Sequence, residues 1–172
     1  DSSWKCSKSN ILYSHVYNGE TVDFNANTDE EFPVRVLDDI NKNILIPTEG
    51  EEVREMARLG VVDIIKTPKG ETVLDFGQNL TGYPEITVNA KAGEQVSLSF
   101  AEILDKNGNF YNENYRSAKC QYHYICREGE QTWHPLLTFF GFRYVRVNAF
   151  PSGAECAKPE NFTAVVVHSD MK

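Results

Sequence analysis

The chain has 172 residues, which is enough for one medium-sized β-rich domain or a domain with a fragment attached, and too few for two full-sized domains. Its formal net charge of −8, with no block of five like charges, argues against a nucleic-acid partner and against an anionic membrane surface. With 41% hydrophobic and 24% charged residues, the composition is that of a folded protein, neither disordered nor membrane-spanning. The opening residues, Asp1 to Trp4, resemble an internal stretch, so we expect a piece of a longer protein.

Alternating apolar and polar side chains predict β-strands in several parts of the chain. The clearest of these strands cover residues 85–89, 95–100, 119–126, 144–149 and 162–167. Clusters of turn-forming residues separate them, at residues 68–70, 91–93, 105–108, 127–129 and 151–153. This spacing predicts an all-β fold, an antiparallel β-sandwich of the jelly-roll type.

The N-terminal third of the chain is less regular. Glu51 to Leu59 has apolar residues at helical spacing, but a strand-like run follows at once, so we predict mainly extended structure from Glu51 to Ile65. Residues 1–28 are polar and rich in Asn and Ser, and we expect them to be the C-terminal remnant of a preceding β module. The sandwich domain would then occupy residues 29–168.

The four cysteines and four histidines are scattered and form no C-x-x-C pair, so the sequence gives no support for a zinc site. We expect neither a metal nor another cofactor. Cys120 and Cys126 fall in one predicted strand, about 20 Å apart along it, and therefore cannot bridge each other. The even number of cysteines permits two disulfides, and free buried thiols are the alternative that we favour.

Two charged residues occupy positions where a strand would point them toward the core. Glu102 has the same parity as Phe100, and Arg143 has the same parity as Val145. A charge that faces a core is unfavourable unless it is paired. We therefore predict that Glu102 and Arg143 approach each other, or another opposite charge, near the rim of the sheet as a structural ion pair. The alternative is that both strands end early and both groups are solvated.

The segment from Asp105 to Asn109 carries oxygen-bearing side chains at alternate positions, as a calcium loop does. It lacks the glycine and the glutamate that such a loop needs, and Asn107-Gly108 is better interpreted as a tight hairpin turn. The sequence also contains no glycine-rich phosphate loop and no nucleophile elbow. The aromatic residues could form a platform for a sugar, although most are expected in the core.

A cluster of poor strand formers, Asp75 to Asn79, directly follows the strand-like residues 72–74. It predicts a strand end where a carboxylate and side-chain amides hydrogen-bond the backbone of a turn, with Phe76 as the buried anchor. Two hypotheses remain open for Gln78 and Asn79. They either face another domain or its sugar, or they only brace the turn.

Ordered motifs make the chain similar to one known family. They are DFGQN at 75–79, AEILD at 101–105, GNFY at 108–111, NYRSAK at 114–119, WHP at 133–135 and GFRYV at 141–145. Together they resemble the non-catalytic β-sandwich module, called concanavalin-like, of the bacterial α-L-rhamnosidase family. Residues 11–20 resemble the end of the family's N-terminal module, and residues 166–170 resemble the segment that enters its catalytic barrel.

This resemblance implies a concanavalin-like sandwich and, at residues 169–172, the start of a linker to a catalytic α-helical barrel outside the chain. The family's enzymes remove terminal α-L-rhamnose by an inverting reaction with two carboxylates, which would lie in that barrel. The chain alone is therefore expected to have no catalytic residue. Its expected partner is the parent chain's catalytic barrel, with rhamnosylated carbohydrate as a second candidate. The favoured setting is bacterial, in the periplasm or outside the cell rather than in the cytoplasm.

The leading interpretation is thus a supporting or docking module of a multidomain α-L-rhamnosidase. The alternative is an autonomous carbohydrate-binding module that uses exposed aromatic and amide side chains. The candidate contacts to a domain or a sugar are Asp75, Gln78, Asn79, Asn112 and Asn114. An enzyme that acts on its own would need Glu102 and a second carboxylate in one open cleft.

Overall fold

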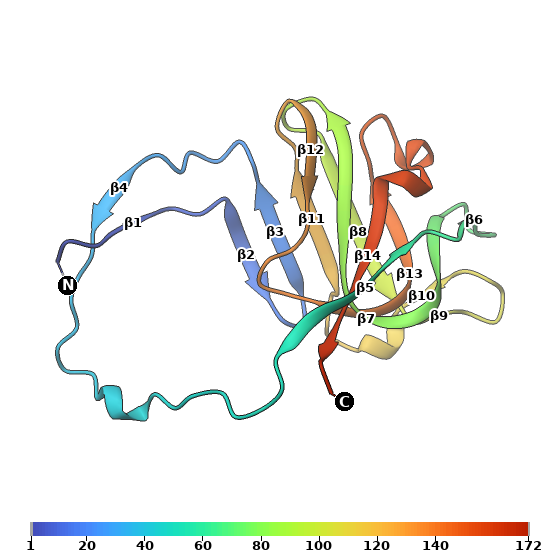
Figure 1. Cartoon of the computed structure of the whole chain (residues 1–172). Coiled ribbons are helices and arrows are strands. Elements are labelled where there is room, and N and C mark those ends of the chain that lie inside the picture. Colours follow the sequence, from blue (N-terminus) through green and yellow to red (C-terminus); the bar gives the residue numbers. More distant parts are fainter. Residues whose placement is uncertain (1, 172) are drawn as a thin grey trace.

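The computed structural model describes residues 2–171, and these residues are organised almost entirely in β-strands (Figure 1). The strands are β1 (Lys5–Ser7), β2 (Ile11–His15), β3 (Gly19–Asp23), β4 (Glu31–Pro33), β5 (Val53–Gly60), β6 (Asp63–Lys66), β7 (Thr72–Ala90), β8 (Gln95–Ala101), β9 (Ile103–Leu104), β10 (Phe110–Tyr111), β11 (Gln121–Ile125), β12 (Gly129–Trp133), β13 (Phe140–Ala149) and β14 (Phe162–Ser169). Short 3-10 helices are η1 (Lys42–Ile44), η2 (Glu113–Tyr115), η3 (Ala154–Cys156) and η4 (Pro159–Asn161). Within residues 2–171, no helix is long and apolar enough to cross a membrane.

Ten strands form one curled sheet in the order β2-β3-β11-β8-β13-β7-β14-β5, with β6 and β12 paired to other parts of β7. The long strand β7 joins the two layers of the fold. Its residues 72–75 pair with β13 and β6, whereas residues 82–90 pair first with β14 and then with β12. The predicted all-β sandwich is confirmed with one correction. The sheet is mixed, because β3 and β11 run parallel.

The core lies between these layers and is rich in aromatic side chains. Phe100 of β8 stacks on Phe140 of β13 with ring centroids 3.9 Å apart. Phe76, the anchor predicted in β7, is buried and meets Phe142 edge-on at 5.6 Å. Ile86, from the far part of β7, joins the same cluster. Because burial of such a side chain contributes about 1.5–3 kcal/mol, this shared cluster holds the two layers together.

Several local predictions can be compared with the observed elements. Residues 51–65 are extended as predicted, in β5 and β6, and the turn predicted at Asn107-Gly108 is confirmed because it connects β9 to β10. The strand end predicted at Asp75 is wrong, since β7 continues through a local kink to Ala90. All four cysteines are free, and only Cys126 is buried.

The N-terminal residues divide between the main sheet and a small separate one. Residues 11–23, expected in a remnant of a preceding module, form β2 and β3 and extend the main sheet beyond β11. In contrast, β1 and β4 pair with each other in a two-stranded sheet of their own. The boundary at residue 28 therefore remains a prediction about a longer chain.

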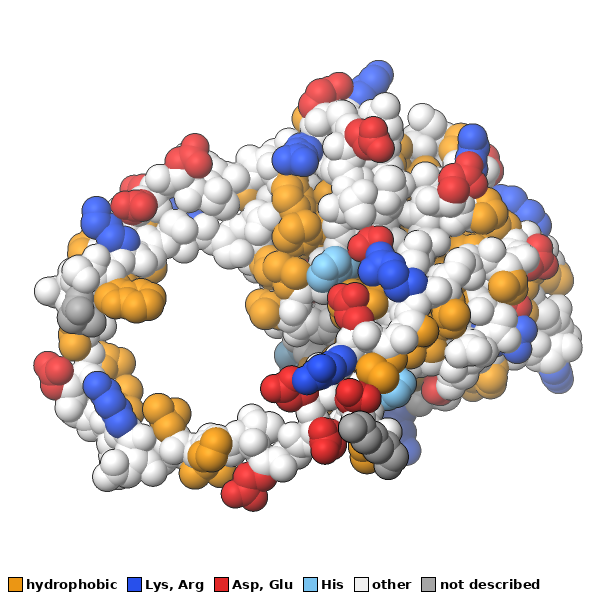
Figure 2. All heavy atoms as spheres, viewed as in Figure 1, with side chains coloured by type: hydrophobic (Ala, Val, Ile, Leu, Met, Phe, Trp, Pro, Cys, Tyr) orange, Lys and Arg blue, Asp and Glu red, His pale blue; other side chains and the backbone are white. Residues whose placement is uncertain are grey.

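Between β3 and β5 the chain leaves the sandwich and forms an arc, residues 27–52, which carries β4 and η1 (Figure 1). In the space-filling view, the arc and the sandwich enclose an opening (Figure 2). Most side chains of the arc are exposed. No residue of the arc belongs to the buried core.

Candidate functional site

Asp75 and Arg143 form a two-point ion pair at the rim of the sandwich. The Nε and Nη2 atoms of Arg143 each donate to one carboxylate oxygen of Asp75, both at 2.9 Å. The side chain of Asp75 is 11% exposed and that of Arg143 is 37% exposed. Two parallel N–H···O bonds fix the orientation of both side chains. The guanidinium also lies over the ring of Tyr144, 4.9 Å from its centroid.

An irregular backbone places this pair. A single residue of β13, Arg143, stands opposite residues 76–79 of β7, which makes a bulge in the pairing of the two strands. Asp75 accepts the N–H of Gly77 at 2.7 Å, and Gly77 has a φ of +80°, in the region that favours glycine. The carboxylate of Asp75 therefore braces the kink in β7.

Glu102 and Arg143 do not pair with each other. Arg143 meets another opposite charge, that of Asp75, as the second form of the prediction has it, whereas Glu102 has no cationic partner among the ion pairs of the described residues. Glu102 accepts from the side-chain amides of Asn79 at 3.2 Å and Asn114 at 3.5 Å. The difference from the prediction has a physical reason in each of the two strands, β8 and β13. Since β8 ends at residue 101, Glu102 follows it in a bend, and the bulge at Arg143 breaks the alternation from which its direction was predicted.

The other predicted site residues lie along or beside the same rim. Gln78 and Asn79 are exposed on the kink, and Asn114 is exposed in η2. Asn112 is partly buried and lines a neighbouring cavity. The structure thus brings Asn79 and Asn114 together on Glu102, while Gln78 and Asn112 stand outside these contacts.

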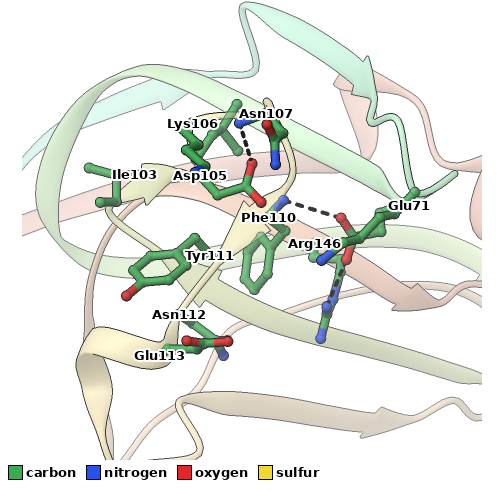
Figure 3. A pocket seen from close by; sticks show the side chains of 12 residues that line it. Glu71, Ile103, Asp105, Lys106, Asn107, Phe110, Tyr111, Asn112, Glu113 and Arg146 are labelled. Carbon is green, nitrogen blue, oxygen red and sulfur yellow. Dashed lines mark hydrogen bonds and ion pairs between the residues drawn. The ribbon is translucent and has the colours of Figure 1, made fainter.

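A cavity of about 680 Å³ opens beside the rim (Figure 3). A second ion pair forms part of its wall, with Nη1 of Arg146 at 2.9 Å from Oε1 of Glu71. The Glu71 carboxylate also accepts the N–H of Phe110 at 3.1 Å, and Arg146 lies over the Phe110 ring at 4.5 Å. In Figure 3, Tyr111 and Asn112 lie on the side of the cavity away from Arg146.

Sequence reasoning missed this second pair. Glu71 directly follows a turn, where a charged residue is normally solvated, and it lies far from Arg146 in the chain. Only the outward parity of Arg146, next to buried Val145 and Val147, could have drawn attention to it. The parity predicts on which face of the sheet Arg146 lies, but it does not predict that Glu71 is its partner.

Two carboxylates at the rim, Asp75 and Glu71, are held in their charged form. The hydrogen bond from Arg143 lowers the pKa of Asp75 and outweighs desolvation, which acts the other way. Desolvation opposes ionisation of Glu71, but hydrogen bonds from Arg146 and the Phe110 backbone outweigh it and lower that pKa as well. These two carboxylates are therefore anions that serve as fixed hydrogen-bond acceptors.

This electrostatic state limits the chemistry that the rim can perform. Hydrolysis of a glycoside needs a carboxyl group with a raised pKa, so that it stays protonated near neutral pH, and Asp75 and Glu71 shift in the opposite direction. The carboxylate of Asp105 is occupied by the backbone N–H groups of Asn107 and Asn109 within its own loop. Across the residues that the structure describes, no three His, Cys, Asp or Glu side chains are grouped to hold a metal ion. Asp75, Glu71 and Asp105 are thus engaged as hydrogen-bond acceptors within the domain.

A curled mixed sheet wrapped around an aromatic core defines the class of the fold, which is a β-sandwich domain. An α-L-rhamnosidase of Alteromonas sp. (strain LOR) is 33% identical over 181 residues, which is 98% of this chain and 20% of the relative. The crystal structure of a native α-L-rhamnosidase from Aspergillus terreus covers 100% of this chain and 21% of its own, with a TM-score of 0.88 and 34% identity. The crystal structure of a Streptomyces avermitilis α-L-rhamnosidase complexed with L-rhamnose covers 94% of this chain and 16% of its own, with a TM-score of 0.80 and 30% identity.

The family described as the bacterial alpha-L-rhamnosidase concanavalin-like domain matches residues 65–168. The chain belongs to this family, and the resemblance found in the sequence motifs is confirmed. The chain spans about a fifth of the length of the curated relatives it matches.

Proposed function

We propose that the chain is a non-catalytic accessory β-sandwich of a multidomain α-L-rhamnosidase, a glycoside hydrolase that removes terminal α-L-rhamnose. In this proposal the sandwich supports or docks on the catalytic domain of the parent chain. Relatives named α-L-rhamnosidase support it, because they match nearly all of this chain with a small part of their own. Their remaining length is sufficient for a separate catalytic domain.

The observation that carries the proposal is the commitment of two carboxylates at the rim, Asp75 and Glu71, to arginine. Asp75 is bound at two points by Arg143, and Glu71 is bound by Arg146. Both pairs hold a carboxylate in the ionised form, which can neither protonate a leaving group nor move freely toward a sugar. A module that contributes shape and polar contacts fits this arrangement better than a hydrolase.

We assign the contacts with the catalytic domain, or with its sugar, to the polar rim. Exposed Gln78, Asn79 and Asn114 can each donate and accept hydrogen bonds without the desolvation penalty of a full charge. Asn112 would contribute from the edge of the cavity. Asp75 would act indirectly, by holding the kink that presents the two amides of β7.

An activity assay tests the proposal. The 172-residue chain, incubated with an aryl α-L-rhamnoside, should release no more product than buffer, whereas the longer parent polypeptide should hydrolyse the substrate. Turnover by the 172-residue chain would contradict the proposal. Calorimetric titration with rhamnose provides the second arm, since saturable binding by the chain alone would favour the carbohydrate-binding alternative.

A further inference from the structure

Arg116 occupies a backbone position that is normally filled by glycine. Its φ is 57° and its ψ is −112°. The N–H of Ala118 donates to the carbonyl of Tyr115 at 3.1 Å, so residues 115–118 form a β-turn with Arg116 in its second position. These angles fit a type II′ turn, in which that position has a positive φ and glycine predominates. A residue with a side chain is therefore strained there.

Hydrogen bonds from the two residues before Arg116 hold this turn in place. The hydroxyl of Tyr115 donates to the carbonyl of Gly141 in β13 at 2.9 Å. The side-chain amide of Asn114 donates to the carboxylate of Glu102 at 3.5 Å. Because a strained conformation persists only where its surroundings fix it, these contacts explain how the turn is maintained at the rim. They do not explain why an arginine is placed in it.

The side chain of Arg116 is exposed, and its guanidinium has no partner. Within residues 2–171 it forms no ion pair, hydrogen bond or ring contact. Glu113, only three residues earlier, does not pair with it, and neither does Glu102, which binds the neighbouring Asn114. Four other arginines each meet a carboxylate, and they are Arg54, Arg58, Arg143 and Arg146. Since the chain has 25 acidic against 17 basic residues, a shortage of carboxylates does not explain the difference.

We propose that Arg116 is an interdomain contact residue, whose guanidinium pairs with a carboxylate on the surface of the parent chain's catalytic domain. The inference rests on the proposed function, which assigns contacts with that domain to the rim. It adds a charged residue to the rim amides and names the group that lies opposite. Strained residues concentrate at functional sites, and a guanidinium binds a carboxylate through two parallel hydrogen bonds. The strained turn therefore holds the charged side chain in place before the two domains meet.

The charge of the chain favours a single protein carboxylate over an anionic polymer as the partner. With a net charge of −8, the chain as a whole repels a polyanion. A single carboxylate on a folded domain is affected mainly by the charges close to it, because salt screens the more distant ones. The matched relatives contain ample further sequence to supply such a group.

The strain can be tested on the 172-residue chain alone. Arg116→Gly should raise its melting temperature by about 2–4 °C, because relief of the strain outweighs the greater freedom that glycine gives the unfolded chain. Arg116→Lys keeps both the positive charge and the strained backbone, and is the matched control with an unchanged melting temperature. Equal melting temperatures for the two variants would contradict the strain on which the inference depends.

Cross-linking in the longer polypeptide tests the partner. A water-soluble carbodiimide condenses a lysine amine with a carboxylate in contact with it. The amide bond forms as the activated carboxylate releases its oxygen with the reagent, which leaves as a urea. In Arg116→Lys, mass spectrometry of the peptides should find an amide within one molecule between position 116 and an Asp or Glu of the catalytic domain, expected beyond residue 172. The unaltered polypeptide is the matched control, since the guanidinium of Arg116 does not form this bond.

Three outcomes of the cross-linking would overturn the inference. They are no amide at position 116, an amide only to carboxylates of residues 2–171, and an amide to a second molecule or to a different domain. The result is independent of catalysis. An active longer polypeptide without the amide contradicts this inference alone. An amide to the domain beyond residue 172, in a polypeptide without rhamnosidase activity, contradicts the proposed function alone.

Discussion

The carboxylate of Glu20 accepts the backbone N–H of Leu137 at 2.9 Å, although the two residues lie near opposite ends of the chain. The same carboxylate accepts the N–H of Leu136 at 3.2 Å. Glu20 lies in β3 and is only 1% exposed. It therefore ties the N-terminal hairpin to the loop between β12 and β13 from inside the fold.

Replacing this carboxylate should destabilise the domain. In Glu20→Ala the N–H groups of Leu136 and Leu137 lose a buried, charged acceptor. Because a hydrogen bond to a charged group contributes about 1.5–3 kcal/mol, we expect the free energy of unfolding to fall by about 2–4 kcal/mol. Glu20→Gln keeps one acceptor oxygen and should lose less. Urea denaturation measures both, with the exposed Glu130→Ala in β12 as the control. Equal stability of Glu20→Ala and Glu130→Ala would contradict the prediction.

The Asp75–Arg143 pair should make stability depend on pH. Because the pKa of Asp75 is lowered in the folded state, its contribution is fully present above the unfolded value of about 3.9 and is lost as the pH falls through the folded value. Asp75→Asn should therefore destabilise the chain at pH 7, with a difference from wild type that shrinks below about pH 4. Urea midpoints from pH 7 to pH 3 measure this. The exposed Asp39→Asn should follow the wild type throughout, and a constant gap for Asp75→Asn would argue against the pairing.

Gly82 allows β7 and β14 to approach closely. A Cβ atom on Gly82 would overlap the backbone carbonyl of Val165 in β14, whereas one on Gly60 in β5 would meet no atom within 4 Å. Gly82→Ala should therefore separate the strands and cost about 1–3 kcal/mol, as overpacking does. Gly60→Ala is the matched control and should change stability by less than about 0.5 kcal/mol. Thermal unfolding of both variants provides the measurement, and similar melting temperatures would refute the close approach.

The exposed amides of the kink can be tested for contact with another domain. Since Gln78 and Asn79 are exposed, Gln78→Ala with Asn79→Ala should change the stability of the 172-residue chain by less than about 1 kcal/mol. We expect the same change in the longer polypeptide to lower rhamnosidase turnover without lowering its melting temperature. Unchanged turnover would leave these amides only a local role, and the exposed Asn43→Ala in the arc is the control.

Strand positions could be predicted because one face of most strands is apolar. Val96, Leu98 and Phe100 are buried in β8 as their alternation indicates. Ser97 and Ser99, which alternate with them, are also buried, because Ser97 bonds the His123 ring at 3.0 Å and Ser99 accepts from Asn148 at 2.8 Å. Alternation alone cannot predict that polar partners on neighbouring strands will cover the second face.

The site was predictable in its location but not in its pairing. The poor strand formers after Leu74 correctly indicated an irregularity that Asp75 braces. The partner of Arg143 depended on a bulge, which shifts a side chain to the other face of the sheet and leaves no periodic signal. The hydrogen bond from Asn79 to Glu102 depends on how the sheet brings two distant parts of the chain together, which the sequence pattern does not reveal.

The parallel pairing of β3 with β11 has a consequence for synthesis of the chain. Residues 19–23 pair with residues 121–125, so the hairpin of β2 and β3 emerges from the ribosome long before its neighbour in the sheet. Until then the free edge of β3 can pair with any available strand, including one from another nascent chain. Non-local pairing of this kind also gives a high contact order, which places folding in the millisecond-to-second range. Correct pairing of β3 with β11 therefore requires that the free edge of β3 is protected from other strands while residues 24–120 are synthesised.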